Sequence, residues 1–208
     1  MKLLNKWKGE RITLDNSTDV STIQAHLQRY MWALSYCANK NVLDVGCGIG
    51  YGTYMVGCVA LSATGIDIST EAIEECKDNY WNDFFVYDIE QYEADHCFDV
   101  VIAFEVIEHI ENMQAGITNI KKAVTDDGII LISMPINQGN NEFHHGRDYS
   151  CEDWIQFIDN NFGDEWERKF FYQPVVTETE GICIKPLVEP FNDAGIIMLS
   201  ITRRKPNE

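Results

Sequence analysis

The chain has 208 residues, of which 45% are hydrophobic and 24% charged, a balance that excludes a disordered chain and fits one globular domain over residues 1–208. Its formal net charge is −17, from 33 acidic and 16 basic residues. Because affinity for a phosphate backbone comes largely from Lys and Arg, nucleic acid is disfavoured as a partner.

The cysteines and the first residues indicate the compartment. Seven cysteines are scattered without a C-x-x-C pair, which argues against a disulfide framework and a structural zinc site and favours a reducing compartment. No apolar stretch long enough for a signal peptide occurs in MKLLNKWKGER, and no later stretch approaches a membrane span. We therefore expect a soluble, cytoplasmic protein without a membrane partner.

Helical and extended patterns alternate along most of the chain. Apolar residues at helical spacing predict an N-terminal helix over 21–38, and Ser69 is expected to cap a helix that reaches about residue 79. Further helices are expected at 51–61, 112–124 and 150–162. The expected strands, in chain order, are 41–45, 63–67, 84–88, 98–104, 129–134, 170–176 and 196–204, with a turn at Asp126-Asp127-Gly128 before the fifth.

This alternation, with its continuous apolar strands, indicates a doubly wound α/β domain around a buried, mostly parallel sheet of seven strands. The last two strands have no helical pattern between them, so we expect an antiparallel hairpin at one edge of the sheet. Residues 1–40 are expected to form an N-terminal cover segment over a core of residues 41–208.

A glycine-rich loop follows the first strand. Gly46, Gly48 and Gly50 permit a tight turn and a close backbone approach to a ligand at the start of the next helix. Asp67 ends the second strand, where a carboxylate can accept both hydroxyls of a ribose, and Asp88 ends the third strand, where it can meet an adenine edge. Each feature also has a purely structural interpretation, as a steric glycine turn or a strand-end helix cap.

Five segments in order resemble the motifs of class I S-adenosylmethionine-dependent methyltransferases, over about residues 20–162. They are VLDVGCGIGYGT (42–53), GIDIS (65–69), VYDIE (86–90), FDVVIAFEVIEHI (98–110) and AVTDDGIILISMPIN (123–137). The resemblance implies a Rossmann-like fold, S-adenosylmethionine as cofactor and S-adenosylhomocysteine as product.

The same resemblance implies the cofactor contacts. The three loop glycines would line the methionine portion, Asp67 would hold the ribose, and Phe104 would border the methyl group. Asp88 and Ile89 would face the adenine. Further expected cofactor contacts are Tyr51, Ile68 and Arg29, whose guanidinium would pair with the methionine carboxylate.

The residues 105–109, Glu-Val-Ile-Glu-His, directly follow the fourth strand and suggest chemistry. If they are helical, Glu105, Glu108 and His109 share one face and converge on the crevice where ligands bind in open α/β sheets. The His144-His145 pair follows the fifth strand and opens onto the same crevice. Three interpretations stay open: a structural helix start, acid/base catalysis by Glu108, His109 and His145, or a divalent metal site.

The pattern is similar to that of ubiquinone-pathway O-methyltransferases and small-RNA terminal 2′-O-methyltransferases, in which two Glu and a His, with a later His, hold a divalent ion. That resemblance implies Mg²⁺ or Mn²⁺ on Glu105, Glu108, His109 and either His144 or His145. A metal there would lower the pKa of an acceptor hydroxyl and orient it.

Three flanking segments point to the acceptor. WKGERI (7–12), AHLQRYMWAL (25–34) and FHHGRDYSCEDW (143–154) resemble the flanks of methyltransferases found with glycan-assembly enzymes, although Gly146 and Asp148 depart from that pattern. By position, His145 matches the subgroup histidine, and His26, Arg29 and Tyr30 would close over the cofactor. Aromatic residues that can stack on sugar rings lie in or near these segments: Trp7, Trp32, Tyr51, Tyr149 and Trp154.

We therefore predict an O-methyltransferase for a hydroxyl of a sugar, free or within a glycan, and expect an association with glycosyltransferases. The alternatives are a small phenolic, quinone-like or lipid-like acceptor, an RNA ribose, and a non-catalytic S-adenosylmethionine-binding module. A nicotinamide-dependent oxidoreductase would share the glycine loop and Asp67, but the GxGxG spacing and the later motifs disfavour it.

Overall fold

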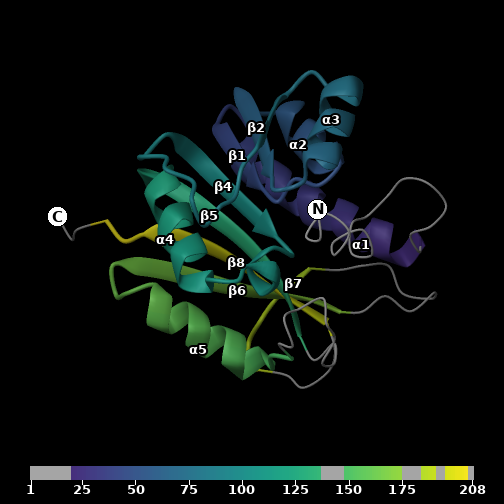
Figure 1. Cartoon of the computed structure of the whole chain (residues 1–208). Coiled ribbons are helices and arrows are strands. Elements are labelled where there is room, and N and C mark those ends of the chain that lie inside the picture. Colours follow the sequence, from purple (N-terminus) through teal and green to yellow (C-terminus); the bar gives the residue numbers. More distant parts are fainter. Residues whose placement is uncertain (1–19, 137–147, 175–183, 191–194, 206–208) are drawn as a thin grey trace.

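The computed structural model describes residues 20–136, 148–174, 184–190 and 195–205. At its centre is one mixed sheet of eight strands in the order β3-β2-β1-β4-β5-β8-β6-β7 (Figure 1). The strands are β1 (Asn41–Val45), β2 (Ser62–Asp67), β3 (Asp83–Val86), β4 (Phe98–Phe104), β5 (Val124–Ile136), β6 (Trp166–Pro174), β7 (Lys185–Pro186) and β8 (Gly195–Arg203).

Helices cover both faces of this sheet (Figure 1). The helices are α1 (Val20–Cys37), α2 (Tyr51–Gly57), α3 (Thr70–Asn79), α4 (Met113–Ala123) and α5 (Cys151–Asn161), with one 3₁₀ turn, η1 (Ile107–His109). Alternate residues of β4 enter different cores: Val101 packs with residues of α4 and α5, whereas Val100 and Ile102 pack with residues of α1 and α2. The strands are apolar on both faces because both faces are covered.

The doubly wound α/β class is confirmed, but the sheet has eight strands and is mixed, whereas seven strands, mostly parallel, were predicted. Strands β3, β2, β1, β4 and β5 are parallel, and β8, β6 and the two-residue β7 add three antiparallel pairings. The predicted hairpin exists as the β6–β8 pair, with β8 inserted next to β5. β7 could not be predicted from hydrophobic alternation because it has only two residues, one of them Pro186.

The predicted turn at Asp126-Asp127-Gly128 is part of β5 in the structure. Val124 pairs with Phe98, but the next pairing joins Ile129 to Val100, so these residues form an irregularity within the strand. Polar residues and glycine resemble a turn in a local pattern, and a bulge uses the same residue types.

The carboxyl ends of β4, β5 and β6 meet at one edge of the sheet. Phe104 pairs with Ser133, Ser133 with Met198, and Met198 with Phe171, which places these residues in one row across four strands. The strand β6 is parallel to β5 because both are antiparallel to β8. Helix α1 crosses this row: the ring of Trp32 contacts the rings of Phe104 and Phe171.

No helix among the residues that the structure describes is both long and apolar enough to cross a membrane.

Candidate functional site

The loop between β1 and α2 depends on glycine conformation. Gly46, Gly48 and Gly50 have φ angles of 67°, 56° and 82°, in the left-handed region that other residues rarely adopt. A Cβ on Gly46 would also lie 2.5 Å from a methyl carbon of Val106, because the segment after β4 packs against the loop. The backbone of this loop therefore lies close to the end of β4, where the predicted catalytic segment begins.

Asp67 joins this loop to the end of β2. Its carboxylate accepts a hydrogen bond from the Gly48 N–H over 3.0 Å and another from the Ser69 N–H over 2.8 Å. An ionised carboxylate has about four acceptor positions, so both ribose hydroxyls can still be accepted. Ser69 caps α3 as predicted, since its hydroxyl accepts from the Ala72 N–H. Its neighbour Ile68 is exposed.

The predicted adenine contacts lie at the end of β3. The Asp88 carboxylate accepts from the Glu90 N–H over 2.9 Å. The Ile89 side chain is buried in the core beside α4, and its carbonyl accepts from the Asn119 side chain. The structure thus places the Ile89 side chain in the core and leaves the Asp88 carboxylate half-buried at the strand end.

Asp44 is a buried carboxylate beneath the loop, and the sequence did not single it out as a site residue. Thr53 of α2 donates to it over 2.6 Å, and the Tyr30 hydroxyl of α1 lies 3.2 Å from both of its oxygens. Burial raises the pKa of Asp44 to about 7, and the hydrogen bonds from Thr53 and Tyr30 oppose that rise. The Asp44 carboxylate therefore links α1 to β1 and α2, the elements on either side of the glycine loop.

Helix α1 brings its predicted residues to the same place. The ring of Tyr30 contacts the rings of Tyr51 and Phe104, with centroids 5.7 Å and 5.3 Å away. Burial raises the pKa of Tyr51, and the charge of nearby Arg29 opposes that shift. Burial, followed by the Arg29 charge, holds the pKa of His26 well below its usual value. The predicted cover helix is therefore close to the glycine loop.

The segment 105–109 is not the helix that the sequence suggested. Only Ile107–His109 are helical, as a single 3₁₀ turn, and Glu105 lies before them with a φ of 55°. The Glu105 N–H donates to the carbonyl and the hydroxyl of Ser133, and the Ser133 hydroxyl donates to the Glu105 carboxylate over 2.7 Å. Contacts with β5 therefore hold a non-glycine residue in a strained conformation, which is characteristic of functional sites.

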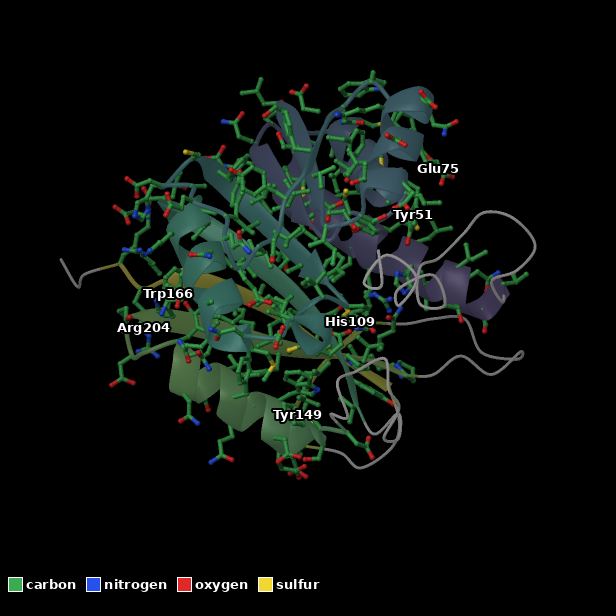
Figure 2. All side chains as sticks on the ribbon, in the orientation of Figure 1. Tyr51, Glu75, His109, Tyr149, Trp166 and Arg204 are labelled. Atoms are coloured by element: carbon green, nitrogen blue, oxygen red, sulfur yellow. The ribbon has the colours of Figure 1, made fainter. Side chains whose placement is uncertain are left out.

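The other two residues of this segment are neighbours. Glu108 is buried, and one of its carboxylate oxygens lies 3.7 Å from Nε2 of the partly exposed His109. Figure 2 shows His109 and Tyr51 on the side of the molecule where α1 lies, whereas Trp166 and Arg204 lie toward the opposite side. Val106, two residues before Glu108, packs against Gly46, so the acid and the imidazole follow directly after a contact with the glycine loop.

The predicted metal site is not formed by the described residues. Within them, no group of three or more His, Cys, Asp and Glu side chains is arranged to hold a metal ion. Because η1 is short and Glu105 is bound by Ser133, the three predicted ligands do not share one helix face. The fourth expected ligand, His144 or His145, lies outside the described residues, as does Trp7.

The two aromatic residues after that gap are part of the core. Trp154 is buried, and its indole N–H donates to the Pro135 carbonyl over 2.7 Å. Tyr149 is half-buried, and its ring packs against the Trp154 ring with centroids 4.6 Å apart. We conclude that Trp154 supports the end of β5 and does not form a stacking platform for a ligand.

Besides Asp44, three polar residues near the site were missed: Thr53, Ser133 and Gln173. All are fully or almost fully buried. Their signal in the sequence is a single polar residue between apolar neighbours, as in Ile132-Ser133-Met134, but the same pattern occurs in strands without a function. The role of such a residue becomes clear only from its hydrogen-bond partner. Here each partner belongs to another segment of the chain.

The model of a family described as "Methyltransferase domain" matches residues 37–170. Among curated proteins, the chain is 33% identical over 119 residues to the ubiquinone biosynthesis O-methyltransferase of Rickettsia akari, a match that covers 55% of this chain and 45% of that protein. The chain spans about half the length of the curated relatives it matches.

Solved structures with the same fold include an S-adenosylmethionine-dependent methyltransferase of Thermotoga maritima, with a TM-score of 0.69, 12% identity, and coverage of 89% of this chain and 92% of that one. The N-methyltransferase NodS of Bradyrhizobium japonicum in complex with S-adenosylhomocysteine has a TM-score of 0.66 and 18% identity, and covers 92% of this chain and 91% of that one. These likenesses show the fold. Together with the family match, they show that the chain belongs to the methyltransferase domain family, in its class I form that uses S-adenosylmethionine.

Proposed function

We propose that this protein is an O-methyltransferase that transfers the methyl group of S-adenosylmethionine to a hydroxyl group of a sugar, free or within a glycan. The observation that carries the proposal is Glu105, a strained residue at the end of β4 whose carboxylate is held by Ser133. It lies directly after Phe104, the residue expected to border the methyl group, where an acceptor must lie.

The reaction is an in-line displacement. An acceptor oxygen forms a bond to the methyl carbon, the bond between that carbon and the sulfonium sulfur breaks, and S-adenosylhomocysteine leaves. The hydroxyl proton must go to a base, and His109, with the Glu108 carboxylate 3.7 Å away, is the proposed base. Glu105 has acceptor capacity beyond its bond to Ser133 and would bind the acceptor hydroxyl.

Two further features support a hydroxylated ring as the acceptor. The ring of Trp32 contacts the rings of Phe104 and Phe171, so aromatic rings gather at the end of β4, next in sequence to Glu105. A sugar presents C–H faces to such rings and hydroxyls to carboxylates. The acidic net charge of −17 agrees with a neutral acceptor better than with a polyanion.

A second candidate, a phenolic or quinone-like hydroxyl, is favoured by the match to ubiquinone biosynthesis O-methyltransferases. A panel of nucleotide sugars, oligosaccharides and catechols, with S-adenosylhomocysteine release as the readout, separates the two candidates. Turnover of catechols alone would replace the sugar proposal. The panel is measured in EDTA and with added Mg²⁺, which tests the predicted metal dependence.

The Glu105→Gln variant tests the proposed site. We expect kcat to fall by roughly 100-fold, the scale of a lost acid/base or charged contact to the reacting group, with unchanged affinity for S-adenosylhomocysteine. Glu75→Gln makes the same chemical change at an exposed position of α3 and is the matched control (Figure 2). Equal turnover of the two variants would contradict the proposal.

A further inference from the structure

Gln173 is a buried amide near the end of β6 that makes two hydrogen bonds to α1. Its carbonyl oxygen accepts from Nη1 of Arg29 over 2.7 Å, and its amide nitrogen donates to the Ala25 carbonyl over 3.1 Å. Both Gln173 and Arg29 are 1% exposed. A single side chain therefore fixes the guanidinium and the helix that carries it, across 144 positions of sequence.

The position of Gln173 in the sheet places it at the ligand-binding edge. Gln173 pairs with Ile196, which pairs with Pro135 near the end of β5. Two residues earlier, Phe171 lies on the same face of β6, where its ring contacts Trp32 of α1. The strand β6 thus contributes to the site through α1, although three strands, β4, β5 and β8, separate it from β1 in the sheet.

Arg29 is a buried cation that has no charged partner among the residues that the structure describes. Of the ion pairs between described residues, none includes Arg29, and its Nε has no hydrogen-bond partner. A buried charge is costly unless an anion or several hydrogen bonds compensate it. The guanidinium is near Tyr51 at the start of α2, where the cofactor's methionine portion is expected, and that portion ends in a carboxylate.

We infer that Gln173 is a positioning residue, a neutral partner that holds the Arg29 guanidinium toward the carboxylate of the cofactor's methionine portion while leaving its charge for that ligand. A carboxylate at position 173 would make the same contact but would neutralise Arg29 before the cofactor arrives. An apolar residue at position 173 would remove the hydrogen-bond acceptor that fixes the orientation of the Arg29 guanidinium. The inference rests on the proposed cofactor site and adds a residue to it.

The test compares two ligands by titration calorimetry: S-adenosylhomocysteine, which has the amino-acid portion, and 5′-methylthioadenosine, which lacks it. In Gln173→Glu and Gln173→Leu, the affinity for S-adenosylhomocysteine should fall by about tenfold or more, as when one charge-assisted hydrogen bond is lost. The affinity for 5′-methylthioadenosine should stay within about twofold. Arg29→Lys should show the same selectivity, and its effect should not add to that of Gln173→Leu because the two residues act together.

Gln24→Glu, the same chemical change at an exposed position of α1, is the control and should alter neither affinity. Equal losses for both ligands would show that Gln173 only supports the fold, and an unchanged affinity of Gln173→Glu for S-adenosylhomocysteine would overturn the inference. Gln173→Glu keeps the size and the acceptor of Gln, so it remains informative if Gln173→Leu fails to fold, as circular dichroism would reveal. A wild-type protein that binds neither ligand would instead refute the proposed cofactor site.

Discussion

The site has two sides that are built by different means. On the β1–β3 side, backbone N–H groups and left-handed glycines dominate, and the contact between Gly48 and Asp67 joins residues 19 positions apart. On the β4–β6 side, side chains from distant elements meet: Glu105 with Ser133 across 28 positions, and Arg29 with Gln173 across 144. A ligand portion common to a whole family can be bound by backbone geometry, whereas the acceptor must be bound by side chains that differ among members.

This difference predicts that changes on the first side lower cofactor affinity, whereas changes at Glu105 and Ser133 on the second side alter turnover. The Arg29–Gln173 pair differs, because it is proposed to act on the carboxylate of the cofactor. The largest effect is expected for Gly46→Ala. The left-handed conformation and the clash with Val106 together should cost about 2–5 kcal/mol, so the affinity for S-adenosylhomocysteine should fall by about 30-fold or more. Titration calorimetry measures this affinity.

Gly163→Ala is the matched control, because an added Cβ there would meet only the end of the flexible Glu165 side chain. If Gly46→Ala bound S-adenosylhomocysteine as tightly as this control, the loop would not be the cofactor site.

Asp67→Asn should have the next largest effect. An amide keeps one oxygen acceptor, so either the bond from Gly48 or the one from Ser69 is lost, together with the charge that both bonds and the ribose hydroxyls use. We expect a loss of about 2 kcal/mol, or roughly 30-fold in S-adenosylhomocysteine affinity. Asp83→Asn, at an exposed position of β3, should leave the affinity unchanged, and similar values for the two variants would contradict the role of Asp67.

Ser133→Ala tests the acceptor side. The variant removes the hydroxyl that holds the Glu105 carboxylate, at a cost of about 1 kcal/mol, so kcat should fall by about fivefold to tenfold. The affinity for S-adenosylhomocysteine should not change, because Ser133 holds Glu105, which is proposed to bind the acceptor and not the cofactor. Ser200→Ala, at another buried serine of the sheet, is the control. A loss of cofactor affinity in Ser133→Ala would mean that the two sides are not independent.

A last prediction concerns the pH dependence of stability, not ligand affinity or turnover, and involves Asp44, which is hydrogen-bonded to Thr53 and Tyr30. Because burial raises its pKa to about 7, the folded protein binds this proton more strongly than the unfolded chain does. The contribution of Asp44 to the free energy of unfolding is therefore fully present below about pH 4 and is lost as the pH rises through about 7. Asp44→Asn should remove this component of the pH dependence, measured by urea unfolding between pH 5 and 8. An identical pH dependence in the wild type and the variant would exclude a contribution of Asp44 to the pH dependence of stability.

Much of the fold and of the cofactor side could be predicted because their signals are local. The glycine spacing, Asp67 at the end of a strand and the Ser69 cap all depend on a few consecutive residues and the backbone conformation that they prefer. The parallel strands were recognisable as apolar runs. The short β7 and the irregularity at Asp126–Gly128 were missed, since their form depends on pairing with neighbouring strands.

The acceptor side depended on tertiary structure. Residues 105–109 resemble a helix start, but the bonds between Glu105 and Ser133 hold Glu105 in a left-handed conformation and leave only a 3₁₀ turn. In the sequence, Gln173 is only one polar residue within a strand, and its hydrogen bond from Arg29 is visible only in the structure. The sequence by itself therefore determined the class of domain and the conformation of the glycine loop, because short-range backbone preferences specify both. Only the tertiary structure decided which distant side chains meet, such as Glu105 with Ser133 and Arg29 with Gln173, because those contacts arise from strand order and helix packing.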